Sequence, residues 1–74
     1  MARSRRRLAK TLAARLREER KTRSWTQEDA AEHCGLVTRH YQKLEAGEIN
    51  VTLATLERLC DAFDEEATDL LRAS

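Results

Sequence analysis

QEDAAEHCGLVTRHYQKL, from Gln27 to Leu44, is the stretch of sequence that decides the fold. Apolar side chains recur at helical spacing on both sides of Gly35, and a glycine readily takes the left-handed backbone conformation of a tight turn. The positions expected to point inward are Ala30, Cys34, Leu36, Tyr41 and Leu44, with the small Ala31 where the helices approach. The pattern predicts a helix-turn-helix whose second helix leaves a polar, partly basic face exposed.

Capping residues set the expected boundaries of these two helices. A helix over residues 27–34 is expected to begin after Thr26, whose hydroxyl can accept a backbone hydrogen bond, and to end at Gly35. The second helix is expected over residues 38–46, because Val37 has no side-chain oxygen with which to cap it one residue earlier.

Three further helices are expected around this pair. The first begins within residues 5–8 and ends near Thr22, since leucines recur in it every four residues. The fourth helix follows the cap Thr52, and a short last helix covers residues 67–72. The inward stripe of the fourth helix is expected to contain Leu53, Leu56, Leu59, Cys60 and Phe63.

The composition agrees with one small all-α domain over residues 1–74, in which residues 1–6 form a basic arm. Charged residues make up 36% of the chain and aromatic residues 4%, with no proline and only two glycines. This composition suits a compact helical fold better than a sheet or a disordered tail. A domain of this size buries only ~60% of its unfolded surface, so a second copy would add stability.

Charge is divided unevenly along the chain. Residues 1–24 hold ten Arg or Lys against two Glu, a balance of +8, whereas residues 25–74 hold four basic against eleven acidic residues, a balance of −7. A basic half can face a phosphate backbone while an acidic half faces away from it. The alternative is a basic leader followed by an ordinary solvated surface.

Targeting to a membrane or to the cell exterior is not expected. The arginines near the N-terminus resemble the charged start of a signal peptide, but no apolar run follows them. No stretch approaches the ~20 apolar residues that a transmembrane helix needs. We therefore expect a cytoplasmic protein whose cysteines stay reduced.

No metal site, cofactor or small-molecule ligand is expected. Cys34, Cys60, His33 and His40 are residue types that bind zinc, but their spacing matches no closed motif. His33 and Cys34 are neighbours on a helix, so their side chains point about 100° apart. No cluster of nucleophile, base and acid is evident either, so an enzyme is not expected.

A helix held away from the body of a small domain fits the major groove of DNA. The landmarks of a known pattern recur along residues 16–71: TQED at 26–29, Ala31, Gly35, LEAG at 44–47 and NVTL at 50–53. Through their joint spacing this segment resembles the Cro and lambda-repressor-like (Xre) family of DNA-binding domains. The resemblance implies a five-helix, lambda-repressor-like bundle that binds double-stranded DNA and reads bases with its third helix.

The resemblance also implies which residues contact DNA. Base contacts are implied for Val37, Thr38, Arg39 and Lys43, and phosphate contacts for Gln27, His40, Gln42 and Asn50. Arg39 and Lys43 are four residues apart, so they share a helix face from which each can donate to guanine. The alternative interpretation of these two side chains is an ordinary solvated helix face.

In the same family an arginine late in the first helix pairs with a glutamate near the end of the third, which implies a pair of Arg20 with Glu45. A guanidinium fork between two helices would fix the angle of the third helix. A homodimer interface is expected at Phe63, Leu70 and Leu71, because they offer more apolar surface than so small a monomer can cover. The alternative is that Leu70 and Leu71 close the core of the monomer itself.

Two classes of function remain. The first is a transcription regulator, such as a repressor or a restriction-modification controller protein, acting as a homodimer on a palindromic operator. The second is an antitoxin-like protein-interaction module built on the same helices. The second predicts an exposed apolar stripe and little need for Arg39 or Lys43. Trp25 is the best candidate for such a stripe, although we expect it to pack at the junction of the first two helices instead.

Overall fold

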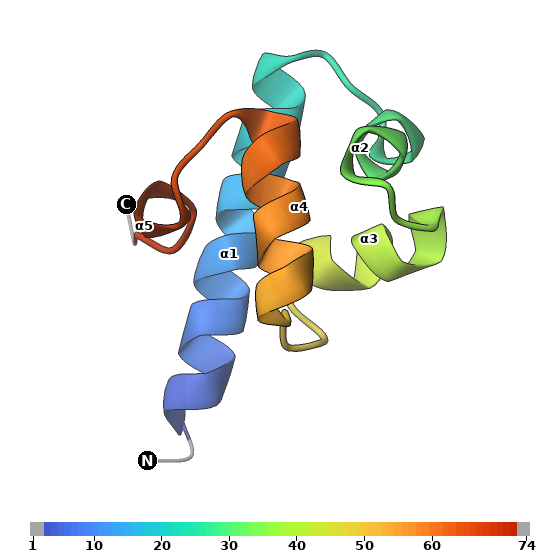
Figure 1. The fold of residues 1–74 in the computed structure, drawn as a ribbon. Helices are drawn as coiled ribbons and strands as arrows, with labels where there is room; N and C mark the ends of the chain where they lie inside the picture. The colour runs from blue at the N-terminus through green and yellow to red at the C-terminus, as the bar shows by residue number, and fades with distance from the viewer. Residues whose placement is uncertain (1–2, 73–74) are drawn as a thin grey trace.

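The computed structural model describes residues 3–72, and in that range the chain forms five α-helices and no strand (Figure 1). The helices are α1 (Arg3–Thr22), α2 (Gln27–Cys34), α3 (Thr38–Glu45), α4 (Leu53–Phe63) and α5 (Ala67–Leu70). The predicted all-α, five-helix architecture is confirmed for this part of the chain.

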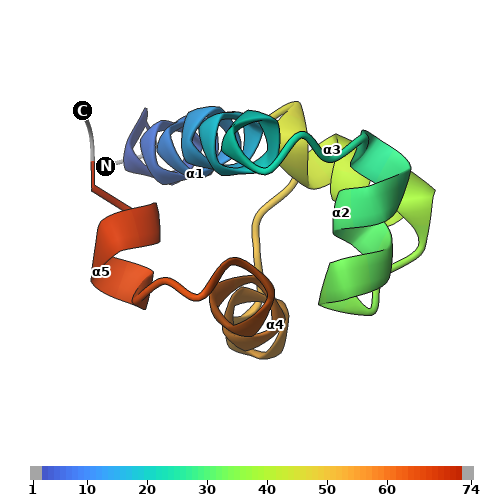
Figure 2. The same ribbon diagram turned by 90° about the horizontal axis from the view of Figure 1, so that it is seen from above.

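The five helices surround one core, as the view from above shows (Figure 2). Helix α2 packs on α3 and α4, α3 also packs on α1, and α5 closes the ring between α1 and α4. The pair α2 and α3 therefore lies on one side of the molecule and α5 on the opposite side.

The core takes large side chains from four of the helices. The largest fully buried side chains are Leu16 of α1, Tyr41 and Leu44 of α3, Leu59 and Phe63 of α4, and Leu70 of α5. Helix α2 contributes the buried alanines Ala30 and Ala31, whose small size lets its axis approach α3. Each fully buried Leu or Phe contributes about 1.5–3 kcal/mol relative to exposure.

Local capping explains the two ends of α2. The Thr26 side chain accepts a hydrogen bond from the Asp29 backbone N–H at 3.0 Å, and the Asp29 carboxylate accepts one from the Thr26 N–H at 2.9 Å. Gly35 ends the helix in the left-handed conformation, with φ of 70°, and its N–H donates to the Glu32 carbonyl. Both ends of α2 lie where the capping residues predict them.

Three predicted boundaries differ from the structure. Helix α1 begins at Arg3, so residues 3–6 of the expected basic arm are helical, while residues 1 and 2 lie outside the described range. Helix α3 ends at Glu45 and α5 at Leu70, both earlier than expected. The last carbonyls of a helix have no hydrogen-bond partner within the helix, so the observed end of a helix often differs by one or two residues from the end expected from sequence.

Leu53 is wrongly predicted as a core residue. It is 81% exposed, whereas Leu56, Leu59 and Phe63 of the same helix are buried. Leu53 is the first residue of α4, so its side chain lies at the end of the helix, beyond the positions that the neighbouring helices cover.

The predicted dimer surface at Phe63 and Leu70 is also wrong. Both side chains are 0% exposed, because α5 packs on α1 and α4 and turns Leu70 into the core beside Phe63. Leu71 is half-buried and packs against the same core. A second copy cannot contact Phe63 or Leu70 unless the monomer opens.

This burial predicts the effect of truncating each leucine. Leu70→Ala should lower the free energy of unfolding by ~2–5 kcal/mol, because it leaves a cavity under α5. The exposed Leu53 is the matched control, and Leu53→Ala should change stability by less than about 0.5 kcal/mol. Urea unfolding followed by circular dichroism measures both values, and equal effects would contradict the burial assigned to Leu70.

Candidate nucleic-acid interface

One face of α3 carries the exposed basic side chains of the helix-turn-helix. Arg39 and Lys43 are exposed and one turn apart, while Tyr41 and Leu44 on the opposite face are buried. Val37, at the start of the helix, is 71% exposed. The structure therefore brings Val37, Arg39 and Lys43 to the outer surface of α3, with Thr38 partly exposed beside them.

The N-termini of α2 and α3 differ in what they offer an anion. Helix α2 has Glu28 and Asp29 in its first turn, and hydrogen bonds from the Thr26 backbone and side chain lower the pKa of Asp29. Helix α3 has no acidic residue in its first turn, and its cap Val37 makes no side-chain hydrogen bond. The first amides of α3 thus remain free of a side-chain cap, which favours a phosphate there over α2.

Arg20 and Glu45 form a bidentate ion pair between α1 and α3. Arg20 Nε donates to Glu45 Oε2 at 2.8 Å, and Arg20 Nη2 donates to Glu45 Oε1 at 2.9 Å. The remaining nitrogen, Nη1, donates to the Trp25 carbonyl at 3.0 Å. Glu45 is only 3% exposed, so this planar fork connects α1, the loop before α2 and the C-terminal end of α3.

The charges of this pair shift the pKa of both groups. The hydrogen bond to Glu45 is the main reason that the pKa of Arg20 is raised. Burial alone would raise the pKa of Glu45, but contacts led by the hydrogen bond from Arg20 outweigh it, and the pKa lies below its ordinary value. Both side chains therefore stay charged at neutral pH.

Gln27 and Gln42 extend this network toward the surface. Gln27 Nε2 donates to Glu45 Oε1 at 3.1 Å, and Gln42 Nε2 donates to Gln27 Oε1 at 3.2 Å. Gln27 therefore bridges α2 and α3 and keeps one of its two amide hydrogens for another acceptor. Of the other two residues with implied phosphate contacts, His40 is half-buried on α3 and Asn50 is exposed in the loop before α4.

Two arginines that the sequence did not single out bond the turn and the C-terminal end of the helix-turn-helix. Arg17 Nη1 of α1 donates to the Glu45 carbonyl at 2.9 Å, and Arg58 Nη1 of α4 donates to the Gly35 carbonyl at 3.0 Å. Each contact joins residues more than twenty positions apart. No local pattern marks such pairs, although Arg17 lies one turn before Arg20 on α1.

Trp25 packs against the body of the domain. Its ring stacks on His33 with centroids 4.0 Å apart and lies 5.5 Å from the Phe63 ring, while the Arg23 guanidinium lies 5.6 Å from the ring centroid. Large exposed apolar residues in the described range are Leu8, Val37 and Leu53, on three different parts of the chain. Trp25 therefore does not form the exposed apolar stripe that a protein-interaction module would need.

Neither a metal cluster nor a membrane span is found among residues 3–72. No group of three or more His, Cys, Asp or Glu in this range is arranged to hold a metal ion. None of the described helices is both long and apolar enough to cross a bilayer. Burial raises the pKa of the Cys34 thiol to about 11, which keeps it protonated.

Comparison with known proteins places these features in a family. Residues 11–73 match the family model of a helix-turn-helix domain. The crystal structure of a hypothetical transcription factor, NHTF from Neisseria, is similar with 30% identity and a TM-score of 0.86, over 90% of this chain and 75% of that one. No curated protein matches the chain.

A second solved structure is similar over much of the chain. It is the clp gene regulator ClgR from Corynebacterium glutamicum, with 28% identity and a TM-score of 0.78. The similarity covers 86% of this chain and 68% of that chain.

The buried pair predicts a large loss of stability when one partner is removed. Glu45→Ala should lower the free energy of unfolding by about 3 kcal/mol, because it leaves the Arg20 guanidinium largely desolvated without its carboxylate. Glu18→Ala is the control, since the Arg15–Glu18 pair is exposed and should contribute only ~0–1 kcal/mol. Chemical denaturation at neutral pH measures the difference. Similar values for the two variants would show that the fork does not stabilise the fold.

The lowered pKa of Glu45 predicts a dependence of stability on pH. A carboxyl whose folded pKa lies below its unfolded value, near 4.5, stabilises the fold above that value and loses this contribution as pH falls through the folded pKa. In Glu45→Gln this part of the acid dependence should be absent. Urea titrations of both proteins between pH 7 and pH 3 test the prediction, which fails if the two pH profiles are parallel.

Proposed function

The chain belongs to the helix-turn-helix domain family, and from this premise we propose that it is a DNA-binding transcription regulator acting as a homodimer on a palindromic operator. The observation that carries the proposal is the exposed pair Arg39 and Lys43 on a helix that the Arg20–Glu45 fork holds in place. One similar solved structure is described as a hypothetical transcription factor and the other as a gene regulator, which supports the same function. Within the family, the motif landmarks favour the Cro and lambda-repressor-like subgroup.

In this proposal α3 enters the major groove and its exposed residues read base edges. The guanidinium of Arg39 can donate two hydrogen bonds to O6 and N7 of one guanine, and the ammonium of Lys43 can donate to a neighbouring base. Val37, an exposed apolar side chain at the start of the helix, suits a thymine methyl. Thr38 beside it can donate or accept one hydrogen bond.

Phosphate contacts position the domain on the duplex. The uncapped first turn of α3 and the second amide hydrogen of Gln27 both offer donors to a phosphate oxygen. His40, Gln42 and Asn50 supply further donors around this helix. The exposed carboxylate of Glu48 follows α3 and would repel phosphate, which limits affinity for DNA of any sequence.

Two-fold symmetry gives the proposed operator its palindromic form. Two copies related by a two-fold axis would place their recognition helices ~34 Å apart, one helical turn along the same side of the duplex.

The protein-interaction alternative is less well supported by the described residues. It requires a continuous exposed apolar surface, but Trp25 is stacked on His33 and the exposed Val37 and Leu53 lie on different helices or loops. The basic side chains of α3 would have no role in that alternative. DNA binding accounts for them directly.

Substitution of Arg39 tests the reading role of α3. After the operator is identified by selection from random duplexes, Arg39→Ala should weaken its binding by ~1–3 kcal/mol and remove the preference at one base pair. Arg39→Lys is the matched variant: it keeps the charge, so affinity for random DNA and its salt dependence should be preserved while the preference at that base pair falls.

A phosphate contact should behave differently. Asn50→Ala is expected to weaken binding to the operator and to random DNA by a similar factor, because phosphates carry no sequence information. Competition binding at two salt concentrations separates the two kinds of residue. If Arg39→Ala leaves the selected sequence unchanged, α3 is not the reading helix.

A further inference from the structure

The side chains of Glu45, Gln27 and Gln42 form a chain of hydrogen bonds from the interior of the domain to its surface. Glu45 is 3% exposed, Gln27 is half-buried and Gln42 is exposed, so burial decreases along the chain. Gln27 Nε2 donates to Glu45 Oε1 at 3.1 Å, and Gln42 Nε2 donates to Gln27 Oε1 at 3.2 Å. We call these three side chains the amide relay.

The charge of Glu45 fixes the direction of both hydrogen bonds in the amide relay. An ionised carboxylate only accepts hydrogen bonds, and Arg20 holds Glu45 in its ionised form through bonds of 2.8 and 2.9 Å. Gln27 must therefore turn its NH2 group toward Glu45 and its oxygen away from it. That oxygen in turn requires the NH2 group of Gln42, because two facing oxygens would repel each other.

The amide relay leaves Gln42 with one oxygen and one hydrogen for a ligand. Its Nε2 donates one of two hydrogens to Gln27, and its Oε1 is not used within the relay. A glutamine that turns freely can exchange its oxygen and its nitrogen, so that it either accepts or donates at the same point. Gln42 cannot make this exchange without losing its bond to Gln27. It therefore presents an acceptor in a fixed place.

Gln42 shares the outward face of α3 with the side chains proposed to read DNA. It follows Arg39 by three residues and precedes Lys43, and residues three or four apart are neighbours on one side of a helix. All three side chains are exposed, whereas Tyr41 and Leu44 are buried on the opposite side of α3. A duplex that contacts Arg39 and Lys43 therefore also meets Gln42.

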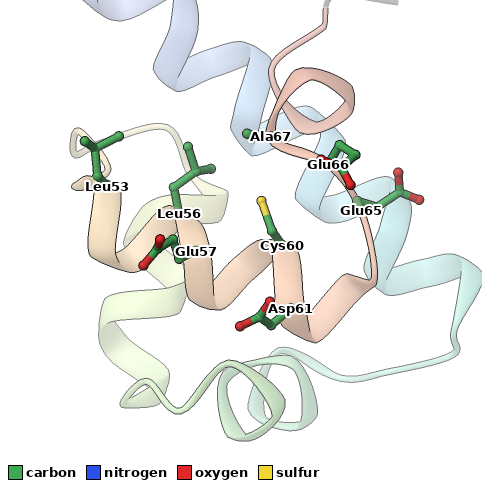
Figure 3. A pocket seen from close by; sticks show the side chains of 8 residues that line it. All are labelled: Leu53, Leu56, Glu57, Cys60, Asp61, Glu65, Glu66 and Ala67. Carbon is green, nitrogen blue, oxygen red and sulfur yellow. The ribbon is translucent and has the colours of Figure 1, made fainter.

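The charge on another surface of the domain also favours the approach of DNA to α3. A hollow of about 600 Å³ lies along α4 and the segment before α5 (Figure 3). Four carboxylates line this hollow, those of Glu57, Asp61, Glu65 and Glu66. Phosphate is repelled from such a surface, whereas the outward face of α3 carries two exposed cations. Together these charges direct a duplex to the face that contains Gln42.

We propose that Gln42 reads an adenine in the major groove and that Gln27 is the positioning residue that fixes its amide. Adenine presents the N6 amino group beside the acceptor N7, which matches the Oε1 and the remaining N–H of Gln42. Guanine presents two acceptors, and its O6 would face the Oε1 of Gln42. The proposal rests on the reading role of α3 in the proposed function, and it assigns Gln42 to a base where the resemblance implies a phosphate.

In this proposal the ion pair that holds α3 in place also influences which base is selected. Loss of the Gln27 amide would leave Gln42 in reach of the base but free to turn. Gln42 could then accept from adenine or donate to guanine, so the preference for one purine would fall. Loss of Gln42 itself would remove every preference at that base pair. Substitutions at the two positions therefore separate reading from positioning.

Selection from random duplexes with the wild type and two variants tests both roles. At one base pair the wild type should prefer adenine to guanine by about tenfold or more, as one bidentate contact allows. Gln42→Ala should reduce this preference to about twofold or less. Gln27→Met has a side chain of similar length but no amide, and it should select adenine and guanine about equally at that pair. Binding to four duplexes that differ only there measures the ratios.

A general loss of affinity does not imitate these results. Gln27 is also proposed to contact a phosphate, so Gln27→Met should weaken binding to every sequence, but such a loss leaves the ratios between sequences unchanged. Asn50→Ala is the matched control, because it removes an exposed amide outside the amide relay. It should weaken binding to all sequences while the selected base stays the same.

Each part of the proposal can fail separately. If Gln42→Ala selects the same sequence as the wild type, Gln42 reads no base and the proposal is overturned; Gln42 is exposed, so this substitution leaves the core intact. Full preference for adenine in Gln27→Met would overturn the positioning role of Gln27. A sequence preference that still depends on Arg39 would in both cases leave the proposed function in place. A wild type that selects no sequence would overturn both.

Discussion

The bidentate ion pair between Arg20 and Glu45 is the contact on which the rest of the structure depends. Helix α3 has only eight residues, and an isolated helix of that length is unstable in water. Its direction is therefore set by its neighbours. Through one carboxylate, Glu45 ties α3 to α1 by Arg20 and to α2 by Gln27, while Arg20 also holds the Trp25 carbonyl. Loss of this carboxylate would remove the hydrogen bonds of α3 to Arg20 and to Gln27 together.

The same network connects stability with the presentation of the proposed reading face. Tyr41 and Leu44 bury one side of α3, and this burial leaves Arg39 and Lys43 on the other side. Apolar burial by itself permits α3 to slide or rotate, because the hydrophobic effect has no direction. The hydrogen bonds of Arg17, Arg20 and Arg58 have fixed geometry. Arg17 and Arg20 attach the C-terminal end of α3 to α1, and Arg58 attaches the turn between α2 and α3 to α4.

Charge serves different purposes in different parts of the domain. Three arginines of α1 and α4 are used internally as hydrogen-bond donors to the helix-turn-helix. Within residues 3–72 Arg39 and Lys43 form no ion pair and are exposed on α3, where an anionic ligand can meet their charges. The remaining charges are divided along the chain, with a basic segment over residues 1–24 and an acidic segment over residues 25–74. A net charge of +1 conceals this division, since attraction depends on where charges lie and not on their sum.

Features that depend on neighbouring residues were determined by the sequence alone. Thr26 with Asp29, and Gly35 after a short apolar pattern, place the start and end of α2, because capping is a contact over three or four residues. The spacing of apolar residues likewise predicted five helices. Only the tertiary structure decided which apolar residues are covered: Leu70 and Phe63 are buried while Leu53 is exposed. It also decided the partners of Arg17, Gln27 and Arg58, because those contacts join residues brought together only when α1, α2 and α4 pack around one core.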